Sequence, residues 1–363
     1  MLSDRVSSAK YIKQVLIDLR FLTIETFCRC YCGGNPHGSK ERAVLTQQQL
    51  DSYIENGFVA VPGLLPPDDV ARVKARATDI AADRVVVPGN ELAGGRRTGV
   101  GRGNRLAPRT GAQAPVASDP ANMISDKHAR RGQQVYPVRQ RAVEDATRQA
   151  AVRAMAAAGD PWVDVERMAH LIDHDDVFRA FSAHPNIVAV LQQLLGPNIK
   201  SIFDHLFYKG PYDGHNRYHQ DGFFEFSDRA CTAWIALHNV TAENGCMRYI
   251  PDTAGYGQFK FDQIADGVTP EMLAMEVLAP VPAGGVVFHD RWTLHATGPN
   301  ETPKGRAGWA VHYASAKSRF IYDPTTEYKT FTQTPDGRHL RDDEVDGNMQ
   351  YRLVSGREFP GCI

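Results

Sequence analysis

The sequence lacks three features that would place it in a specialised class of proteins. No apolar run among its 363 residues reaches the length of a membrane span, and charged residues interrupt the apolar segment 11–27. The 41 basic and 42 acidic residues nearly cancel, which removes any overall electrostatic attraction to nucleic acid or an anionic membrane. Six cysteines are too few for a disulfide scaffold in a chain of this length. We therefore expect a cytoplasmic protein without a membrane or nucleic-acid partner.

Hydrophobic periodicity divides the chain into an extension and one larger domain. Residues 1–44 are expected to form a flexible extension or a short amphipathic helix. Cys28, Cys30 and Cys32 stand at alternate positions there, a spacing that differs from the two-residue gaps usual in zinc sites. From Leu45 onward, helical patterns come first and alternating patterns come later. This order predicts a single α+β domain over 45–363, with a β-barrel or sandwich that carries the site.

The expected elements of this domain can be read directly from the patterns. A capping box at Thr46 and Gln49 begins the first helix, and Gly57 ends it. Further helices are predicted at 67–82, 143–158 and 185–195. Strands are predicted at 58–61, 199–209, 230–240, 245–250, 277–281, 286–289 and 308–314.

Residues 88–141 form an insertion in which glycine, proline and arginine dominate and periodicity is weak. One interpretation is a long surface loop. The other is a mobile lid whose arginines contact an anionic substrate. The arginines in question are Arg96, Arg97, Arg102, Arg105 and Arg109.

The most informative stretch contains His219 and Asp221. On an extended strand, residues two apart point to the same face, so this imidazole and this carboxylate can converge on one ion. One more histidine would complete the two-histidine, one-carboxylate set that holds non-haem Fe(II) and leaves coordination positions open. A second copy of the motif, His174-Asp175-Asp176, lies in a helical pattern, where positions two apart diverge. We expect that copy to form an acidic helix cap instead.

Two histidines compete for the third position. His289 comes after a buried-looking strand and could simply end it. His295 is favoured by two downstream residues, Thr297 and, eleven positions after the histidine, Arg306. A co-substrate such as 2-oxoglutarate chelates Fe(II) through its keto-acid end and leaves a distal carboxylate. An arginine meets a buried carboxylate well, and a hydroxyl adds a further hydrogen bond.

The order of several short motifs resembles that of the phytanoyl-CoA dioxygenase family of Fe(II)/2-oxoglutarate oxygenases. The matching segments are 45–58, 194–199, 218–221, 233–237, 240–247 and 295–300, with Arg306 after them. One departure is Ile250-Pro251-Asp252-Thr253, where relatives often carry Ile-Pro-Gly-Ser. Together with the 88–141 insertion, this departure means that a CoA-ester substrate does not carry over.

The resemblance implies a double-stranded β-helix (jelly-roll, cupin-like) barrel flanked by N-terminal helices. It implies His219, Asp221 and His295 as iron ligands, Arg306 as the anchor of 2-oxoglutarate, and Thr297 beside that arginine. The predicted cofactor pocket also includes Trp234, Gln220, His205 and Arg167. For Trp234 and His205, an ordinary place in the barrel core is the alternative.

The predicted function is hydroxylation, or another oxidation, of an unactivated C–H bond in a small molecule. The reaction would need Fe(II), 2-oxoglutarate as co-substrate and O2, and it would release succinate and CO2. Asp221 favours this over halogenation, because an alanine or glycine there would open a halide site. Two alternatives remain: a nucleic-acid oxygenase on the same fold, and a catalytically silent metal-binding barrel. The sequence does not determine the substrate or whether it is anionic. It also leaves open the stereochemistry and the oligomeric state.

Overall fold

The computed structural model describes residues 45–82, 146–163, 165, 167–169, 171–214, 216–221, 228–257, 268–319 and 351–362. The chain divides into two compact units, residues 1–42 and 43–363, and all described residues belong to the second. The predicted extension with its cysteine cluster, and the arginine-rich insertion, lie outside the described residues. The nucleic-acid alternative depended on that insertion.

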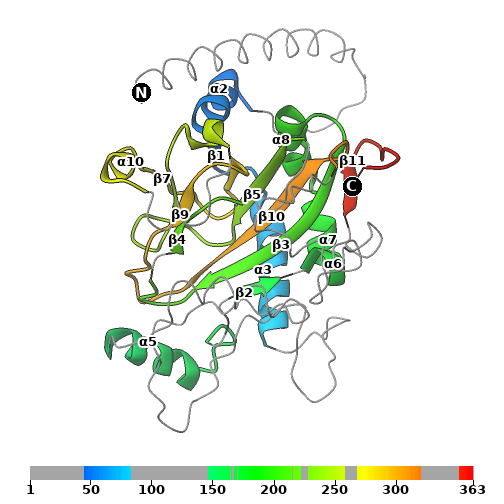
Figure 1. Cartoon of the computed structure of the whole chain (residues 1–363). Helices are drawn as coiled ribbons and strands as arrows, with labels where there is room; N and C mark the ends of the chain where they lie inside the picture. Colours follow the sequence, from blue (N-terminus) through cyan, green and yellow to red (C-terminus); the bar gives the residue numbers. More distant parts are fainter. Residues whose placement is uncertain are drawn as a thin grey trace, which may run out of the picture. The chain divides into compact units, whose positions relative to one another are not determined.

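Two antiparallel sheets form the centre of the second unit (Figure 1). The larger, seven-stranded sheet has the order β1-β8-β5-β10-β3-β11, and β2 also pairs with β3. The smaller, four-stranded sheet has the order β4-β9-β6-β7. Among the described residues no strand joins the two sheets into a closed barrel. The bounds in the larger sheet are β1 Phe58–Val61, β2 Arg167–Ala169, β3 Ile199–Lys209, β5 Ala230–Ala236, β8 Val286–Asp290, β10 Arg306–Ser315 and β11 Arg352–Ser355, and in the smaller sheet β4 Asn216–His219, β6 Met247–Tyr249, β7 Val277–Ala279 and β9 His295–Thr297.

The predicted helices are confirmed, with ends shifted by a few residues. Thr46 and Gln49 form the capping box, and Gly57 ends the first helix in the left-handed conformation at φ 82°. The helical pattern expected at His174-Asp175-Asp176 is confirmed by two short helices on either side of Asp175, and Asp175 caps the second of them. A short helix after Thr269 was not predicted. The helices are α2 Gln47–Asn56, α3 Pro67–Ala81, α5 Ala146–Ala157, α6 Leu171–His174, α7 Asp176–Ser182, α8 Pro185–Leu195 and α10 Pro270–Ala274, with a 3-10 turn η1 at Thr253–Tyr256.

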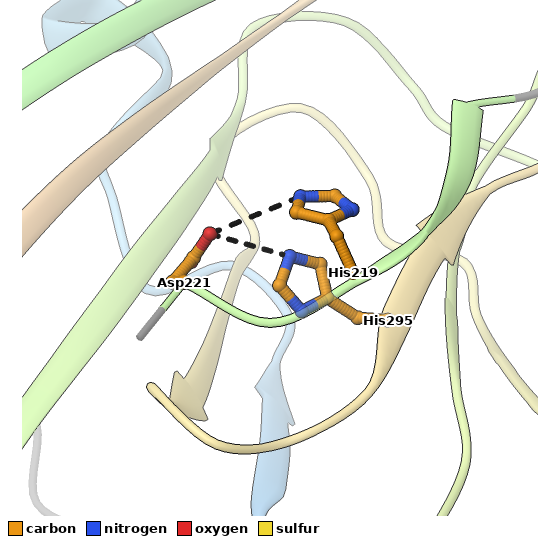
Figure 2. A group of neighbouring side chains, drawn as sticks. All are labelled: His219, Asp221 and His295. Carbon is orange, nitrogen blue, oxygen red and sulfur yellow. Dashed lines mark ion pairs between the residues drawn. The ribbon is translucent and has the colours of Figure 1, made fainter. Parts of the chain in front are cut away.

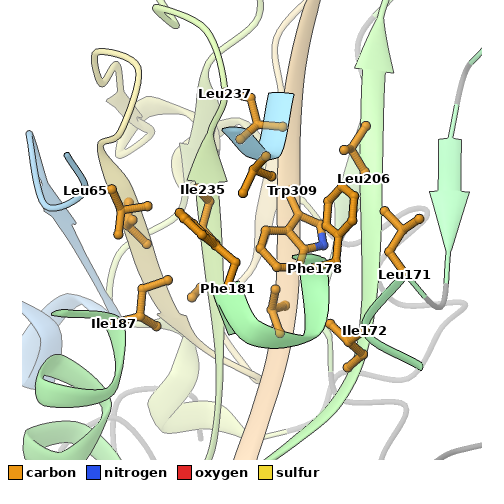
Figure 3. Packing of buried hydrophobic residues seen from close by; sticks show 14 of the residues in the cluster. Leu65, Leu171, Ile172, Phe178, Phe181, Ile187, Leu206, Ile235, Leu237 and Trp309 are labelled. Carbon is orange, nitrogen blue, oxygen red and sulfur yellow. The ribbon is translucent and has the colours of Figure 1, made fainter. Parts of the chain in front are cut away.

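Alternation along the central strands separates two cores. On β10, Trp309 and Val311 belong to the main core, which α3, α7 and α8 complete (Figure 3). Ala310, on the opposite face, packs in a second cluster together with Trp234 of β5 and Tyr249 of β6. Because strand side chains alternate between faces, the face of the larger sheet that carries Ala310 is turned toward the smaller sheet. Polar residues on that face are therefore enclosed between the sheets.

The short strands agree only in part with the expectations. The short strands β2, β9 and β11 were not predicted. The extended strand expected for His219 and Asp221 is present as β4, but it ends at His219, so that Asp221 lies beyond the strand. Its carboxylate instead makes hydrogen bonds with residues of the larger sheet, which draw it away from the line of β4. None of the helices in the described segments has the length and apolarity needed to span a bilayer.

Candidate metal centre

His219, Asp221 and His295 meet at one point (Figure 2). The pairing of β4 with β9 places His219 opposite His295, at the end of one strand and the start of the other. The Nε2 atoms lie 3.8 Å (His219) and 3.6 Å (His295) from Oδ1 of Asp221. One ligand atom from each residue lies within 4.8 Å of the others. The structure thus brings together the three residues that the sequence indicated as a metal-binding set.

Hydrogen bonds to the backbone orient both imidazoles in the same way. Nδ1 of His219 lies 3.0 Å from the carbonyl oxygen of Arg217, and Nδ1 of His295 lies 2.9 Å from that of Thr293. A carbonyl only accepts, so each Nδ1 carries the proton and each Nε2 presents a lone pair. This is the arrangement in which histidine ligates a metal through Nε2.

The spacing and chemistry of these donors fit a transition-metal ion. Two donors bound at about 2.1 Å and at right angles to each other lie about 3.0 Å apart. The observed separations of 3.6 and 3.8 Å exceed hydrogen-bond length, and a small contraction would bring both nitrogens and the oxygen onto one ion. Nitrogen and oxygen donors of this kind suit Fe(II).

Electrostatics keep the donor atoms in their metal-binding forms. Burial alone would raise the pKa of Asp221, but the imidazoles of His295, His312 and His289 hold it well below its usual range. Burial lowers the pKa of His295 well below that of a free imidazole, and the neighbouring His219 adds to this effect. The carboxylate is therefore ionised and the His295 ring neutral, as metal ligation requires.

The second oxygen of Asp221 is held by two residues that sequence reasoning did not assign this role. Oδ2 lies 2.7 Å from Oγ1 of Thr232 on β5 and 2.9 Å from Nε2 of His289 on β8. His289, the rival for the third position, therefore contacts the other carboxylate oxygen, and its ring lies 4.3 Å from that of His295. The signal that distinguishes the two histidines is strand register, which pairs His289 with Thr232 and His295 with His219.

Arg306 begins β10 and is 2% exposed. Its Nη2 donates to the carbonyl of Gly245, and its Cζ lies 5.4 Å from the ring centre of Trp234. None of the described acidic residues forms an ion pair with it, and burial lowers its pKa to about 10. The indole of Trp234 packs against the backbone of Gly308, where an added Cβ would stand 2.1 Å from the ring. A larger residue at this position would therefore displace Trp234. A buried guanidinium without a carboxylate partner is suited to bind an anion.

Thr297 supplies a second unsatisfied group. It lies two residues after His295 on β9 and therefore points to the same face of the strand. Its hydroxyl is buried and has no hydrogen-bond partner among the described residues. Buried polar groups usually have partners, so an orphaned hydroxyl indicates a missing ligand.

The remaining predicted residues make contacts other than those with the three candidate ligands. The amide of Gln220 donates to the backbone carbonyls of Gly257 and Trp292, which ties two loops together. His205 packs edge-on against Phe203 at 4.5 Å. Arg167 pairs in register with Phe207, so Arg167 and His205 lie on the face of the larger sheet turned toward the smaller one. Their roles as cofactor contacts stay predictions.

Comparison with known proteins identifies the family. The sequence profile named phytanoyl-CoA dioxygenase (PhyH) matches residues 53–308. The chain belongs to this family. It is a non-haem Fe(II)/2-oxoglutarate-dependent dioxygenase by family, and the His219–Asp221–His295 cluster is a site that could hold the metal.

Individual relatives are distant. The chain is 23% identical over 296 residues to rat "Phytanoyl-CoA dioxygenase, peroxisomal", covering 77% of this chain and 71% of that protein. It is 26% identical over 192 residues to rat "Phytanoyl-CoA dioxygenase domain-containing protein 1", covering 48% and 65%. The solved structure of the α-ketoglutarate-dependent epimerase SnoN superposes with a TM-score of 0.52 at 20% identity, covering 86% of this chain and 96% of SnoN. That similarity establishes a shared fold.

Proposed function

We propose that this dioxygenase hydroxylates, or otherwise oxidises, an unactivated C–H bond of a small molecule. The observation that carries the proposal is the convergence of His219, Asp221 and His295, with Arg306 buried on β10 of the larger sheet and Thr297 buried on β9 of the smaller sheet. When bound, Fe(II) would supply the oxidising chemistry, in which O2 and 2-oxoglutarate yield succinate, CO2 and an oxidised substrate.

The protein residues would hold and orient the reactants. His219 Nε2, His295 Nε2 and Asp221 Oδ1 would ligate the ion and leave positions for 2-oxoglutarate and O2. Arg306 would bind the distal carboxylate of 2-oxoglutarate, and the orphaned hydroxyl of Thr297 would donate a hydrogen bond to it. Trp234 covers one face of the guanidinium and keeps water from it.

The two sheets would correspond to the halves of a double-stranded β-helix, within one catalytic domain over residues 45–363. The fold shared with SnoN supports this assignment, as does the second core cluster, which combines residues of both sheets. A cytoplasmic location belongs to the same proposal. The rat relative carries "peroxisomal" in its name, so cell fractionation must distinguish the two compartments.

The substrate would bind on the side of the cluster that Oδ1 of Asp221 faces. A cavity beside Asp221, lined by Ile202, Thr232, Arg291 and His312 among others, has room for about one water molecule and is too small to hold a substrate. The names of the relatives state phytanoyl-CoA as a substrate of those proteins, so phytanoyl-CoA belongs in a first panel of small carboxylates, phosphates and acyl esters.

The decisive experiment measures succinate release from 2-oxoglutarate by the iron-loaded protein, with and without each candidate substrate. We expect substrate-stimulated succinate formation, a slow background without substrate, and loss of both in Arg306→Ala. An exposed arginine, Arg72, provides the matched control, because Arg72→Ala removes the same charge at a site 64% exposed. Succinate formation no faster than that of Arg306→Ala across the whole panel would overturn the proposal.

A further inference from the structure

We propose that His289, Thr232, Tyr249 and His312 form a positioning network that restricts Asp221 to a single metal-facing oxygen. The inference rests on the proposed function, in which Asp221 ligates the ion. It adds a role for four residues that belong neither to the proposed ligand set nor to the proposed 2-oxoglutarate anchor.

The two oxygens of Asp221 have separate surroundings. Oδ1 faces the Nε2 atoms of His219 and His295 at 3.8 and 3.6 Å. Oδ2 lies within hydrogen-bond distance of Thr232 and His289, at 2.7 and 2.9 Å. The carboxylate is thus divided between a metal-facing oxygen and an oxygen bound by the protein.

The direction of each hydrogen bond is set by the chemistry of the groups. An ionised carboxylate only accepts, so Nε2 of His289 and Oγ1 of Thr232 both donate to Oδ2. In the tautomer with its proton on Nε2, Nδ1 of His289 accepts from the Tyr249 hydroxyl, 2.9 Å away. The single proton of the Thr232 hydroxyl is already used, so that oxygen accepts from Nδ1 of His312, also at 2.9 Å. Two chains of donors therefore end on one oxygen.

The network is rigid because it is buried and anchored in different strands. The His289 side chain is 1% exposed and the Asp221 side chain 7% exposed. Tyr249 comes from β6 of the smaller sheet, whereas Thr232, His289 and His312 come from β5, β8 and β10 of the larger sheet. Aromatic packing fixes both ends, since Tyr249 stacks on Phe58 at 4.2 Å and His312 stacks on Phe203 at 4.5 Å.

This arrangement has a direct consequence for coordination. A carboxylate can bind an ion through one oxygen or two, and the second mode would occupy a position that 2-oxoglutarate or O2 needs. Two hydrogen bonds on Oδ2 favour the first mode. His289 and Thr232 would therefore protect open positions, and Tyr249 would do so indirectly by fixing the His289 tautomer.

The test uses Co(II) as a spectroscopic probe in the full chain. Calorimetric titration measures Co(II) affinity and then the affinity of the Co(II)-loaded protein for 2-oxoglutarate, while visible absorption reports coordination number. We expect His289→Leu to weaken Co(II) binding by about 10- to 100-fold, to change the absorption spectrum and to weaken 2-oxoglutarate binding. His289→Gln should restore much of this, because its amide can accept from Tyr249 and donate to Asp221.

A milder variant guards against a simple folding defect. Tyr249→Phe removes one hydroxyl and should weaken Co(II) and 2-oxoglutarate binding by up to about tenfold. The matched control is Tyr313→Phe, which removes another buried hydroxyl whose one hydrogen bond among the described residues is to the backbone carbonyl of Ser182, at 2.8 Å. Tyr313→Phe should cost similar thermal stability and leave both affinities unchanged.

The outcomes separate this inference from the proposed function. If the wild-type protein binds no Co(II), both fail. If it binds Co(II) and 2-oxoglutarate but folded His289→Leu and Tyr249→Phe match it in affinity and spectrum, the positioning network is overturned while the proposed function stands.

Discussion

The chain contains the motif His-x-Asp at 174–176 and at 219–221, and the two copies have different structural roles. In the first, Asp175 is the N-cap of α7, accepting from the backbone nitrogens of Val177 and Phe178 at 2.9 and 3.2 Å. Its other oxygen pairs with Arg76 at 2.7 Å. In the second, Asp221 is buried among imidazoles, with one oxygen facing two Nε2 lone pairs. The motif acquires a chemical role only where neighbouring strands bring a further histidine to it.

The largest expected difference between the copies is in metal binding. Asp221→Asn removes the charged ligand and should weaken Co(II) or Fe(II) binding by at least about 100-fold, because the facial set loses its carboxylate. Asp176→Asn, at a side chain 93% exposed, should leave metal affinity unchanged. Calorimetric titration of both variants checks this. Equal affinities in the two variants would remove Asp221 from the ligand set.

The free energy of unfolding, in contrast to metal affinity, should respond to a change in the first copy of the motif. Asp175→Ala removes the helix cap and leaves Arg76 without its partner, so we expect unfolding to become easier by about 2–3 kcal/mol. Metal affinity of the folded variant should not change. Urea unfolding of the metal-free protein measures the first effect, and metal titration below the transition measures the second. A loss of metal affinity in folded Asp175→Ala would contradict the separation.

Acid affects both measurements, because protons compete with the metal for its ligands and also destabilise the fold. Burial, with a smaller contribution from Lys74, lowers the pKa of His238 from 6.5 to about 4. Between pH 4 and pH 6.5 the unfolded state then binds more protons than the folded state. The stabilisation that comes from the neutral His238 ring is therefore complete above pH 6.5 and is lost as the pH falls toward 4. The loss should be at most about 3 kcal/mol for this group. Urea unfolding of chelator-treated protein at pH 7 and pH 5 tests it, and His238→Gln should flatten the dependence.

The smallest expected effect concerns Thr297, which lies on β9, the strand that also carries His295. Thr297→Val keeps the shape and removes the orphaned hydroxyl, so the KM for 2-oxoglutarate should rise by about 5- to 10-fold, corresponding to one hydrogen bond. Metal affinity should stay the same. Initial rates of succinate release measure the change. An unchanged KM would separate the hydroxyl from the co-substrate.

Much of the fold was predictable because its signals are local. The capping box at Thr46, the left-handed Gly57 and the long alternating strand that became β10 all depend on neighbours in sequence. Strand β9 has three residues and is defined by its pairing in the smaller sheet. Its sequence alone carries too little pattern to indicate a strand, and the sequence of β4 does not show that the strand stops at His219.

The candidate site shows the same division. The composition around His295, with Thr297 and Arg306 after it, carried enough information to favour this histidine over His289. The position of Asp221 beyond β4 could not be predicted from sequence, because its hydrogen bonds reach Thr232 and His289 on other strands. A threonine within a buried strand has no distinguishing signal until the register of that strand is known.

The placement of the donors has one more consequence, for the cohesion of the protein. His219 and His295 stand on the smaller sheet, whereas Asp221 is fastened by hydrogen bonds to the larger one. An ion bound by all three would link the two sheets. Removing it with a chelator should therefore speed amide hydrogen exchange in β4 and β9 while β3 and β10 stay protected. The supply of iron would then determine how stably the smaller sheet is attached to the larger one.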